Sequence, residues 1–222
     1  MKLVSISFDD GTIYDKRFIE LLNKYHLRAT FNLNSGLDNY VWYYEDKIAI
    51  KRPCLAEVKD IYKGHEVASH TSTHPKLTEE SDEEIIRQVN SDIDKLSEIF
   101  SCEVPSFAVP FDLCNEHIIE VVRNNTKAKN IRTPYYMPNT FLPKDPYHLG
   151  ITAMYDDKDI YERLETFIKN DDPVSYFIIA GHTYEFEVKD DWGKIEDLLK
   201  YLSSHDEFEV VTVKEAVKRI FG

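Results

Sequence analysis

Two kinds of hydrophobic pattern alternate along the chain. Short, nearly continuous apolar runs, such as residues 3–8 and 174–180, are typical of buried β-strands. Between such runs lie longer segments in which apolar side chains recur three and four residues apart. Phe18, Leu21 and Leu22 have this spacing, which is typical of the buried face of an amphipathic helix. The pattern therefore predicts strands and helices in turn.

The predicted elements continue to the end of the chain. The strands are expected at residues 3–8, 29–34, 65–69, 106–109, 127–132, 151–154, 174–180 and 208–211. The helices are expected at residues 14–25, 55–63, 78–100, 116–122, 160–168 and 192–202, followed by a last helix that ends at Phe221. Two long connections, 35–53 and 133–150, are expected to be loops; the first is rich in aromatic residues and the second is interrupted by prolines.

Regular alternation of strands and helices indicates a parallel sheet with helical crossovers. The alternation repeats about seven or eight times, and no Gly/Ser-rich linker or change in composition divides the chain. We therefore expect one domain over residues 1–222. Its predicted fold is α/β, a distorted or incomplete (β/α)7-8 barrel with parallel strands, because 222 residues is short for eight full units.

The charge of the chain excludes some partners. With 27 basic and 40 acidic residues the net charge is −13, whereas a surface that follows phosphates needs a basic excess. We expect no nucleic-acid partner, and no apolar run is long enough for a membrane span. The three cysteines form no C-x-x-C pair, and we expect no signal peptide because the sequence opens directly on the first predicted strand. These features predict a cytoplasmic protein with reduced thiols.

The first strand ends in two adjacent carboxylates, Asp9 and Asp10, followed by Gly11. Neighbouring side chains of a strand point to opposite faces, so the two acids converge only if the strand ends there, and Gly11 permits a sharp turn. The carboxyl ends of parallel strands are where α/β folds place their chemistry. A solvated Asp/Gly turn is the plain alternative.

Three histidines follow in positions that favour a site. His70 and His74 are four residues apart and would share one face of a helical turn, close enough to bind one ion. With a strand-end carboxylate they would form a two-histidine, one-carboxylate metal site. His182 ends a buried strand, although a histidine there can also be an ordinary core residue.

These segments together resemble the polysaccharide deacetylases, carbohydrate esterase family 4. The resemblance rests on Ser-Phe-Asp-Asp-Gly at 7–11, Ser-His-Thr-Ser-Thr-His-Pro at 69–75, Pro110-Phe111 and His182. Their order and spacing match the family over essentially the whole chain. Residues 30–36 and 181–186 resemble a small, single-domain bacterial branch of that family.

The resemblance implies a role for each motif. Asp10, His70 and His74 would bind one divalent metal ion. Asp9 would be the general base and His182 the general acid. The resemblance also implies that the backbone N–H at Phe111, after Pro110, helps to hold the oxyanion.

The chain departs from the family pattern in its third motif. Ala108 occupies the position where the family often has an arginine that orients the base, and Asp112 replaces a glycine. We hypothesise that Arg132 supplies the missing guanidinium beside Asp9. Two further candidates for substrate binding are Trp42, in the aromatic connection, and Tyr184. The aromatic residues of that connection would either stack on sugar rings or fix the loop to the barrel rim.

The sequence therefore predicts a metal-dependent hydrolase that removes acetyl groups from an amino-sugar oligo- or polysaccharide. N-acetyl groups are favoured over O-acetyl groups. The expected cofactor is zinc, although nickel, cobalt or iron would fit the same ligands. Two alternatives stay open. One is a cyclic imide or ureide hydrolase of the same wider family, and the other is a sugar-binding barrel without catalytic activity.

Overall fold

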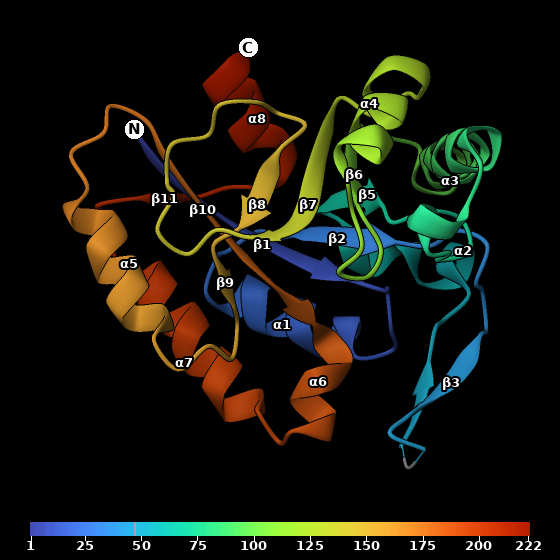
Figure 1. The fold of residues 1–222 in the computed structure, drawn as a ribbon. Coiled ribbons are helices and arrows are strands. Elements are labelled where there is room, and N and C mark those ends of the chain that lie inside the picture. Colours follow the sequence, from blue (N-terminus) through green and yellow to red (C-terminus); the bar gives the residue numbers. More distant parts are fainter. Residues whose placement is uncertain (47) are drawn as a thin grey trace.

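Eight parallel strands form a nearly closed barrel at the centre of the molecule. The computed structural model describes residues 1–46 and 48–222 (Figure 1). The barrel strands are β1 (Lys2–Asp9), β2 (Thr30–Leu33), β5 (Glu66–Ser69), β6 (Ser106–Ala108), β7 (Asn130–Tyr136), β8 (Leu149–Ile151), β9 (Ala153–Met154) and β10 (Ser175–His182). They neighbour one another in the order β8-β7-β6-β5-β2-β1-β10-β9, and the short β11 (Glu209–Val210) pairs with β1.

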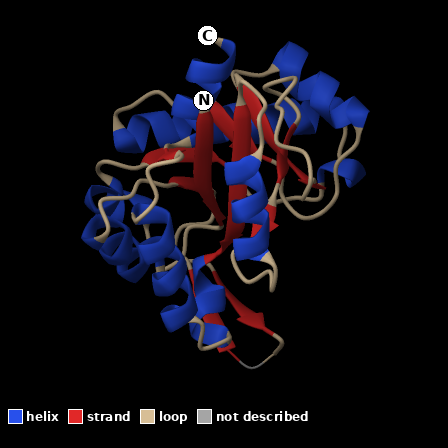
Figure 2. Ribbon diagram, turned by 90° about the vertical axis from the view of Figure 1, so that its left-hand side faces the viewer, coloured by secondary structure: helices blue, strands red, loops and turns tan. Residues whose placement is uncertain are grey.

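Helices surround the strands (Figure 2). The α-helices are α1 (Asp15–Lys24), α2 (Leu55–Val58), α3 (Asp82–Phe100), α4 (Glu116–Asn125), α5 (Ile160–Lys169), α6 (Thr183–Val188), α7 (Trp192–Ser203) and α8 (Val213–Phe221), with 3-10 turns η1 (Lys59–Tyr62) and η2 (Leu77–Glu79). None of the helices in the described part of the chain has both the length and the apolar character that a membrane crossing requires.

Alternation along the strands gives the barrel an outer and an inner face. Val4, Ile6 and Phe8 of β1 belong to the large apolar cluster under the helices. Leu3, on the opposite face of the same strand, belongs to a smaller cluster with Val213 of α8. Helix α8 therefore covers the amino-terminal end of the barrel, which leaves the carboxyl end for a site.

One segment, residues 149–154, joins the two edges of the barrel. Its first part, β8, pairs with β7, and its second part, β9, pairs with β10. Between them Thr152 donates its backbone N–H to the carbonyl of Ile178 over 2.9 Å and accepts the Ile178 N–H on its hydroxyl at 3.1 Å. The expected distorted parallel barrel is thus confirmed.

The elements differ from the sequence prediction in the two expected loops and in two helices: α6 was not predicted, and the expected helix 55–63 is α2 followed by η1. Within 35–53 the chain forms an antiparallel hairpin of β3 (Val41–Tyr44) and β4 (Ile48–Lys51), which projects from the body of the molecule (Figures 1 and 2). Within 133–150, β7 continues to Tyr136 and β8 begins at Leu149, so the irregular part is shorter than expected. Pro134 is tolerated because β7 pairs irregularly with β8 between Arg132 and Tyr136.

Candidate active site

The first strand ends where the sequence predicts, and its end brings two carboxylates to one cavity. Strand β1 stops at Asp9, and Asp10 and Gly11 both have left-handed backbone conformations, with φ of 80° and 62°. The Asp10 N–H still bonds to the Asn32 carbonyl at 3.0 Å, so the turn remains attached to β2. The two acids therefore both line the cavity at the carboxyl end of the barrel.

His70 and His74 come together by a different route from the expected helical turn. The segment from His70 to His74 contains no helix; instead Thr71 and His74 adopt left-handed conformations, with φ of 67° and 55°. The His74 N–H bonds to the Thr71 hydroxyl at 3.1 Å, which holds the loop closed. The spacing of the two histidines correctly indicated that they lie together, but the helical turn expected to bring them together was wrong.

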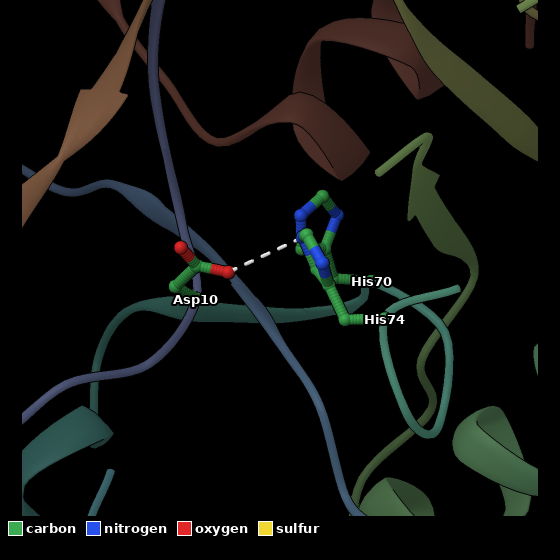
Figure 3. Close-up of side chains that lie close together, drawn as sticks. All are labelled: Asp10, His70 and His74. Carbon is green, nitrogen blue, oxygen red and sulfur yellow. Dashed lines mark ion pairs between the residues drawn. The ribbon is translucent and has the colours of Figure 1, made fainter. Parts of the chain in front are cut away.

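Asp10, His70 and His74 form a group that could bind a metal ion (Figure 3). Each contributes one ligand atom, and these atoms lie within 4.8 Å of one another. His74 Nε2 is 3.4 Å from Asp10 Oδ1. The His70 Nδ1–H group points at the Ala108 carbonyl at 2.9 Å, which leaves Nε2 with a free lone pair. The donor set and the tautomer of His70 therefore fit a divalent cation.

Burial keeps the two imidazoles neutral. It lowers the pKa of His74 to about 4, with a further contribution from His70, and it also lowers the pKa of His70. For Asp10, the charged neighbours together affect the pKa more than burial does. Burial raises its pKa, but His182, Arg52 and the other histidines outweigh burial and bring the pKa to about 2. The group thus offers two neutral imidazoles and one carboxylate, the forms in which these side chains bind metals.

Arg132 lies directly against Asp9. Its Nη2 donates to both carboxylate oxygens, at 2.7 and 2.6 Å, and the Asn32 amide donates to Oδ1 at 2.7 Å. Burial raises the pKa of Asp9, but Arg132 and the nearby histidines outweigh it, so the pKa lies below the usual aspartate value. Asp9 is therefore an ionised carboxylate, fixed by two donors, next to the candidate metal ligands.

His182 faces the same two acids from the end of β10. Its Nε2 is 3.9 Å from Asp10 Oδ2, and its Nδ1 is 3.5 Å from Glu185 Oε2. Burial lowers the pKa of His182, but Glu185, Asp10 and Asp9 together raise it to about 9. The imidazole is therefore protonated at neutral pH, which suits a proton donor.

Two polar residues of the site have no part in the sequence prediction. Arg52, just after β4, donates to Asp10 Oδ1 at 2.8 Å and to the Asn34 side chain. Asn34 in turn donates to the His70 carbonyl at 2.6 Å. Asn32 and Asn34 recur at the period of a strand, which was a usable signal, whereas nothing in the aromatic connection marked Arg52.

Asp92 of α3 is a further residue that the sequence prediction missed. Its carboxylate accepts bonds from the Ser69 hydroxyl at 2.6 Å, the His70 N–H at 3.2 Å and the Ser35 N–H at 2.7 Å. It thereby fixes the end of β5, from which His70 projects. In sequence, Asp92 was one acid among several on a long, charged helix, so no signal distinguished it.

The cavity has a volume of about 750 Å³, a size typical of small-molecule sites. Trp42, Phe111 and Tyr184 line it, whereas Pro110 is buried immediately before Phe111. Trp42 packs its ring edge against Tyr184, with ring centres 5.6 Å apart, and Phe111 packs against His74 at 4.4 Å. The aromatic side chains are thus attached to the rim of the barrel as well as lining the cavity.

Fold and site together define a parallel (β/α) barrel with an Asp-His-His group at its carboxyl end that could bind a metal ion. Residues 1–128 match the family model of polysaccharide deacetylases, and the chain belongs to this family. Among curated proteins it is similar to the peptidoglycan-N-acetylmuramic acid deacetylase PdaC of Bacillus subtilis, with 26% identity over 119 residues. That match covers 53% of this chain and 23% of PdaC, so the chain spans about a quarter of the relative's length.

Solved structures share the fold over nearly the whole chain. The Xyl-CE4 domain of a multidomain xylanase from the hindgut metagenome of Trinervitermes trinervoides superposes with a TM-score of 0.61 and 17% identity, covering 98% of this chain and 90% of that one. A family 4 acetyl xylan esterase from Clostridium thermocellum, in complex with a cobalt ion, superposes with a TM-score of 0.60 and 17% identity. That match covers 98% of this chain and 91% of the esterase chain.

Proposed function

We propose that this chain is a metal-dependent hydrolase that removes N-acetyl groups from an amino-sugar oligo- or polysaccharide. The observation that supports it best is the meeting of five side chains at one cavity: Asp9, Asp10, His70, His74 and His182. Membership of the polysaccharide deacetylase family supports the reaction class. The similarity to a peptidoglycan deacetylase supports an amino sugar as the substrate.

In this proposal Asp10, His70 and His74 hold one divalent cation. Zinc is the expected ion because two imidazoles and a carboxylate suit it, and nickel, cobalt or iron would fit the same ligands. When bound, the cation polarises the acyl carbonyl and makes water more acidic. The cobalt ion in the related acetyl xylan esterase agrees with such a site.

The residues around the cation would move the protons. Asp9, held ionised and oriented by Arg132, would accept the proton of the attacking water. His182, kept protonated by Glu185 and the two aspartates, would donate a proton to the departing amine. The backbone N–H of Phe111 would donate to the oxyanion. Trp42 and Tyr184 would contact the sugar from the rim of the cavity.

The test combines metal analysis with acetate release. Wild-type protein is expected to bind about one zinc or similar ion per chain and to release acetate from N-acetylated chitooligosaccharides or peptidoglycan fragments. His74→Ala should lose both properties. His117→Ala is a matched control, because His117 is exposed on α4 and pairs with Asp82; it should behave like the wild type.

Other outcomes would favour the alternatives. Acetate release from acetylated xylan alone would show that the enzyme removes O-acetyl rather than N-acetyl groups. Hydrolysis of cyclic imides or ureides without acetate release would identify the neighbouring enzyme class. Sugar binding without a bound metal and without turnover would indicate a sugar-binding barrel that lacks catalytic activity.

A further inference from the structure

Arg52 lies between the aromatic hairpin and the metal-binding group. Only 7% of its surface is exposed, and its Nη2 donates to Asp10 Oδ1 at 2.8 Å. The same oxygen faces His74 Nε2 at 3.4 Å. A cation bound by Asp10 and His74 would therefore have a guanidinium attached to one of its own ligands.

The position of Arg52 is fixed by several contacts. Its backbone N–H donates to the Tyr40 carbonyl at 2.9 Å, and its guanidinium lies 5.0 Å from the centre of the Trp42 ring. Its Nη1 bonds to Asn34, whose amide donates to the His70 carbonyl. Arg52 is thus tied to the hairpin and to the segments that supply two of the three candidate ligands.

Each of the two adjacent acids has its own guanidinium. Arg132 pairs with Asp9 at 2.6 Å, and Arg52 pairs with Asp10 at 2.8 Å; the four side chains are each at most 10% exposed. These four charges cancel before any cation binds, and the charged His182 has its own partner in the Glu185 carboxylate at 3.5 Å. A divalent cation therefore adds two positive charges to buried pairs that are already balanced, where charges interact more strongly than in water.

We propose that Arg52 sets the charge of the metal centre: it lowers the affinity of Asp10, His70 and His74 for a divalent cation and leaves the loaded site with excess positive charge. This inference rests on the proposed function, since it assumes that these residues bind a cation. The excess charge would favour the negative charge that develops on the acyl oxygen during hydrolysis. Arg52 in this role acts through Asp10, as a positioning and charge-setting residue.

Charge and orientation make opposite predictions for a substitution at this position. If Arg52 mainly orients the carboxylate, its loss should weaken metal binding by about 10- to 100-fold, as for other partners of metal ligands. If its charge dominates, removing that charge should strengthen binding. Arg52→Gln removes the charge and keeps an N–H donor, whereas Arg52→Lys keeps the charge and loses the planar fork that reaches both Asp10 and Asn34.

The experiment measures Zn²⁺ and Co²⁺ affinity of the metal-free full chain by competition with a chelating dye. We expect Arg52→Gln to bind at least about tenfold more tightly than the wild type, and Arg52→Lys to stay within about threefold of it. Arg123→Gln is the control, because Arg123 also pairs with a carboxylate, Asp145, but lies outside the cavity; it should leave the affinity unchanged. The visible absorption of bound Co²⁺ checks that the ligands are the same in each variant.

Each result has a definite meaning. Weaker or equal binding by Arg52→Gln overturns the charge-setting role and leaves the metal site itself intact. If Arg52→Gln does not fold, Arg52→Lys decides alone: a loss of about tenfold or more shows that orientation dominates and refutes the proposal. A wild-type chain that binds no divalent cation refutes the proposed function and this inference with it.

Discussion

At the scale of single residues, the Asp9 carboxylate is held by an arginine from a different strand than the family pattern would give. In the third motif Ala108 stands where the family often has an arginine, and it contributes its carbonyl to His70 instead. Arg132, one strand further along the barrel, pairs with Ala108 in register and reaches both oxygens of Asp9. The neighbouring strand thus supplies the guanidinium to the same carboxylate.

Substitution of Arg132 tests this assignment. In Arg132→Ala the Asp9 carboxylate loses its bidentate partner, so we expect acetate release to fall by about 100-fold, the size of a typical general-base contribution. Metal content should stay unchanged, because the Arg132 guanidinium donates to Asp9, which is not one of the candidate metal ligands. The measurement is kcat/KM on an N-acetylated oligosaccharide, with metal analysis of the same samples.

The matched control is Arg123→Ala, which removes an arginine paired with Asp145 outside the cavity. It should retain wild-type turnover. Full turnover in Arg132→Ala would show that Asp9 needs no guanidinium, and the hypothesis that Arg132 replaces the missing arginine would be wrong.

The residues that sequence alone could identify are those with a local signal. Asp9, Asp10, His70, His74 and His182 stand at strand ends or in a distinctive spacing, and the structure places them around one cavity. Arg52 and Asp92 reach the site only through the fold. Arg52 comes from a hairpin and Asp92 from the interior of a helix, and neither position is marked by the residues beside it in the chain.

At the scale of elements, agreement follows the length and regularity of the hydrophobic pattern. Helix α3 begins after Ser81, whose side chain accepts the Glu84 N–H, and α8 begins after Thr212, which forms a full capping box with Glu215. The hairpin was missed because Val41–Tyr44 and Ile48–Lys51 are short and almost wholly apolar or aromatic. The sequence therefore shows no alternation of polar and apolar residues that would distinguish them from a loop rich in aromatic residues.

A buried carboxylate joins three elements behind the site. Asp15, at the start of α1, accepts bonds from the Tyr62 hydroxyl at 2.7 Å and from Thr183, the first residue of α6. The Thr183 hydroxyl also lies 2.9 Å from that of Thr12. This network fixes the chain that follows Gly11 to the helix that follows His182.

Asp15 should make the stability of the protein depend on pH. Burial raises its pKa to about 6, although the bonds from Thr183 and Tyr62 oppose this. The unfolded chain has an ordinary aspartate pKa near about 4, so the folded state holds the proton more tightly. The stabilisation is complete below about pH 4 and is lost as the pH rises through about 6.

The comparison with Asp15→Asn isolates this effect. Between pH 4 and pH 7 the free energy of unfolding of the wild type should fall by about 3 kcal/mol relative to Asp15→Asn, since the pKa difference is about two units. Urea unfolding at several pH values measures it. Asp171→Asn, at an exposed position, should run parallel to the wild type. A constant offset between wild type and Asp15→Asn would contradict a raised pKa.

At the scale of the whole molecule, a nearly closed barrel holds the strand ends in a ring around one cavity. The site draws on β1, β2, β5, β7 and β10, so its geometry depends on closure between residues 149–154 and β10. That closure uses few backbone bonds, because β9 is only two residues long. A side chain adds a further hydrogen bond to this closure, because the Thr152 hydroxyl, between β8 and β9, accepts the Ile178 N–H.

Thr152→Val should therefore weaken the barrel at its closing segment. Valine has nearly the same shape as threonine, and Thr152 is only 2% exposed, so the Ile178 N–H would lose its protein acceptor. We expect the free energy of unfolding to fall by about 1–3 kcal/mol, the cost of an unpaired buried donor. Urea unfolding measures the loss, and amide hydrogen exchange should localise it to β9 and β10.

The control Thr166→Val removes a hydroxyl that bonds to the Glu162 carbonyl on the exposed side of α5, and should change stability by less than about 0.5 kcal/mol. Equal stability of the two variants would mean that backbone pairing alone closes the barrel.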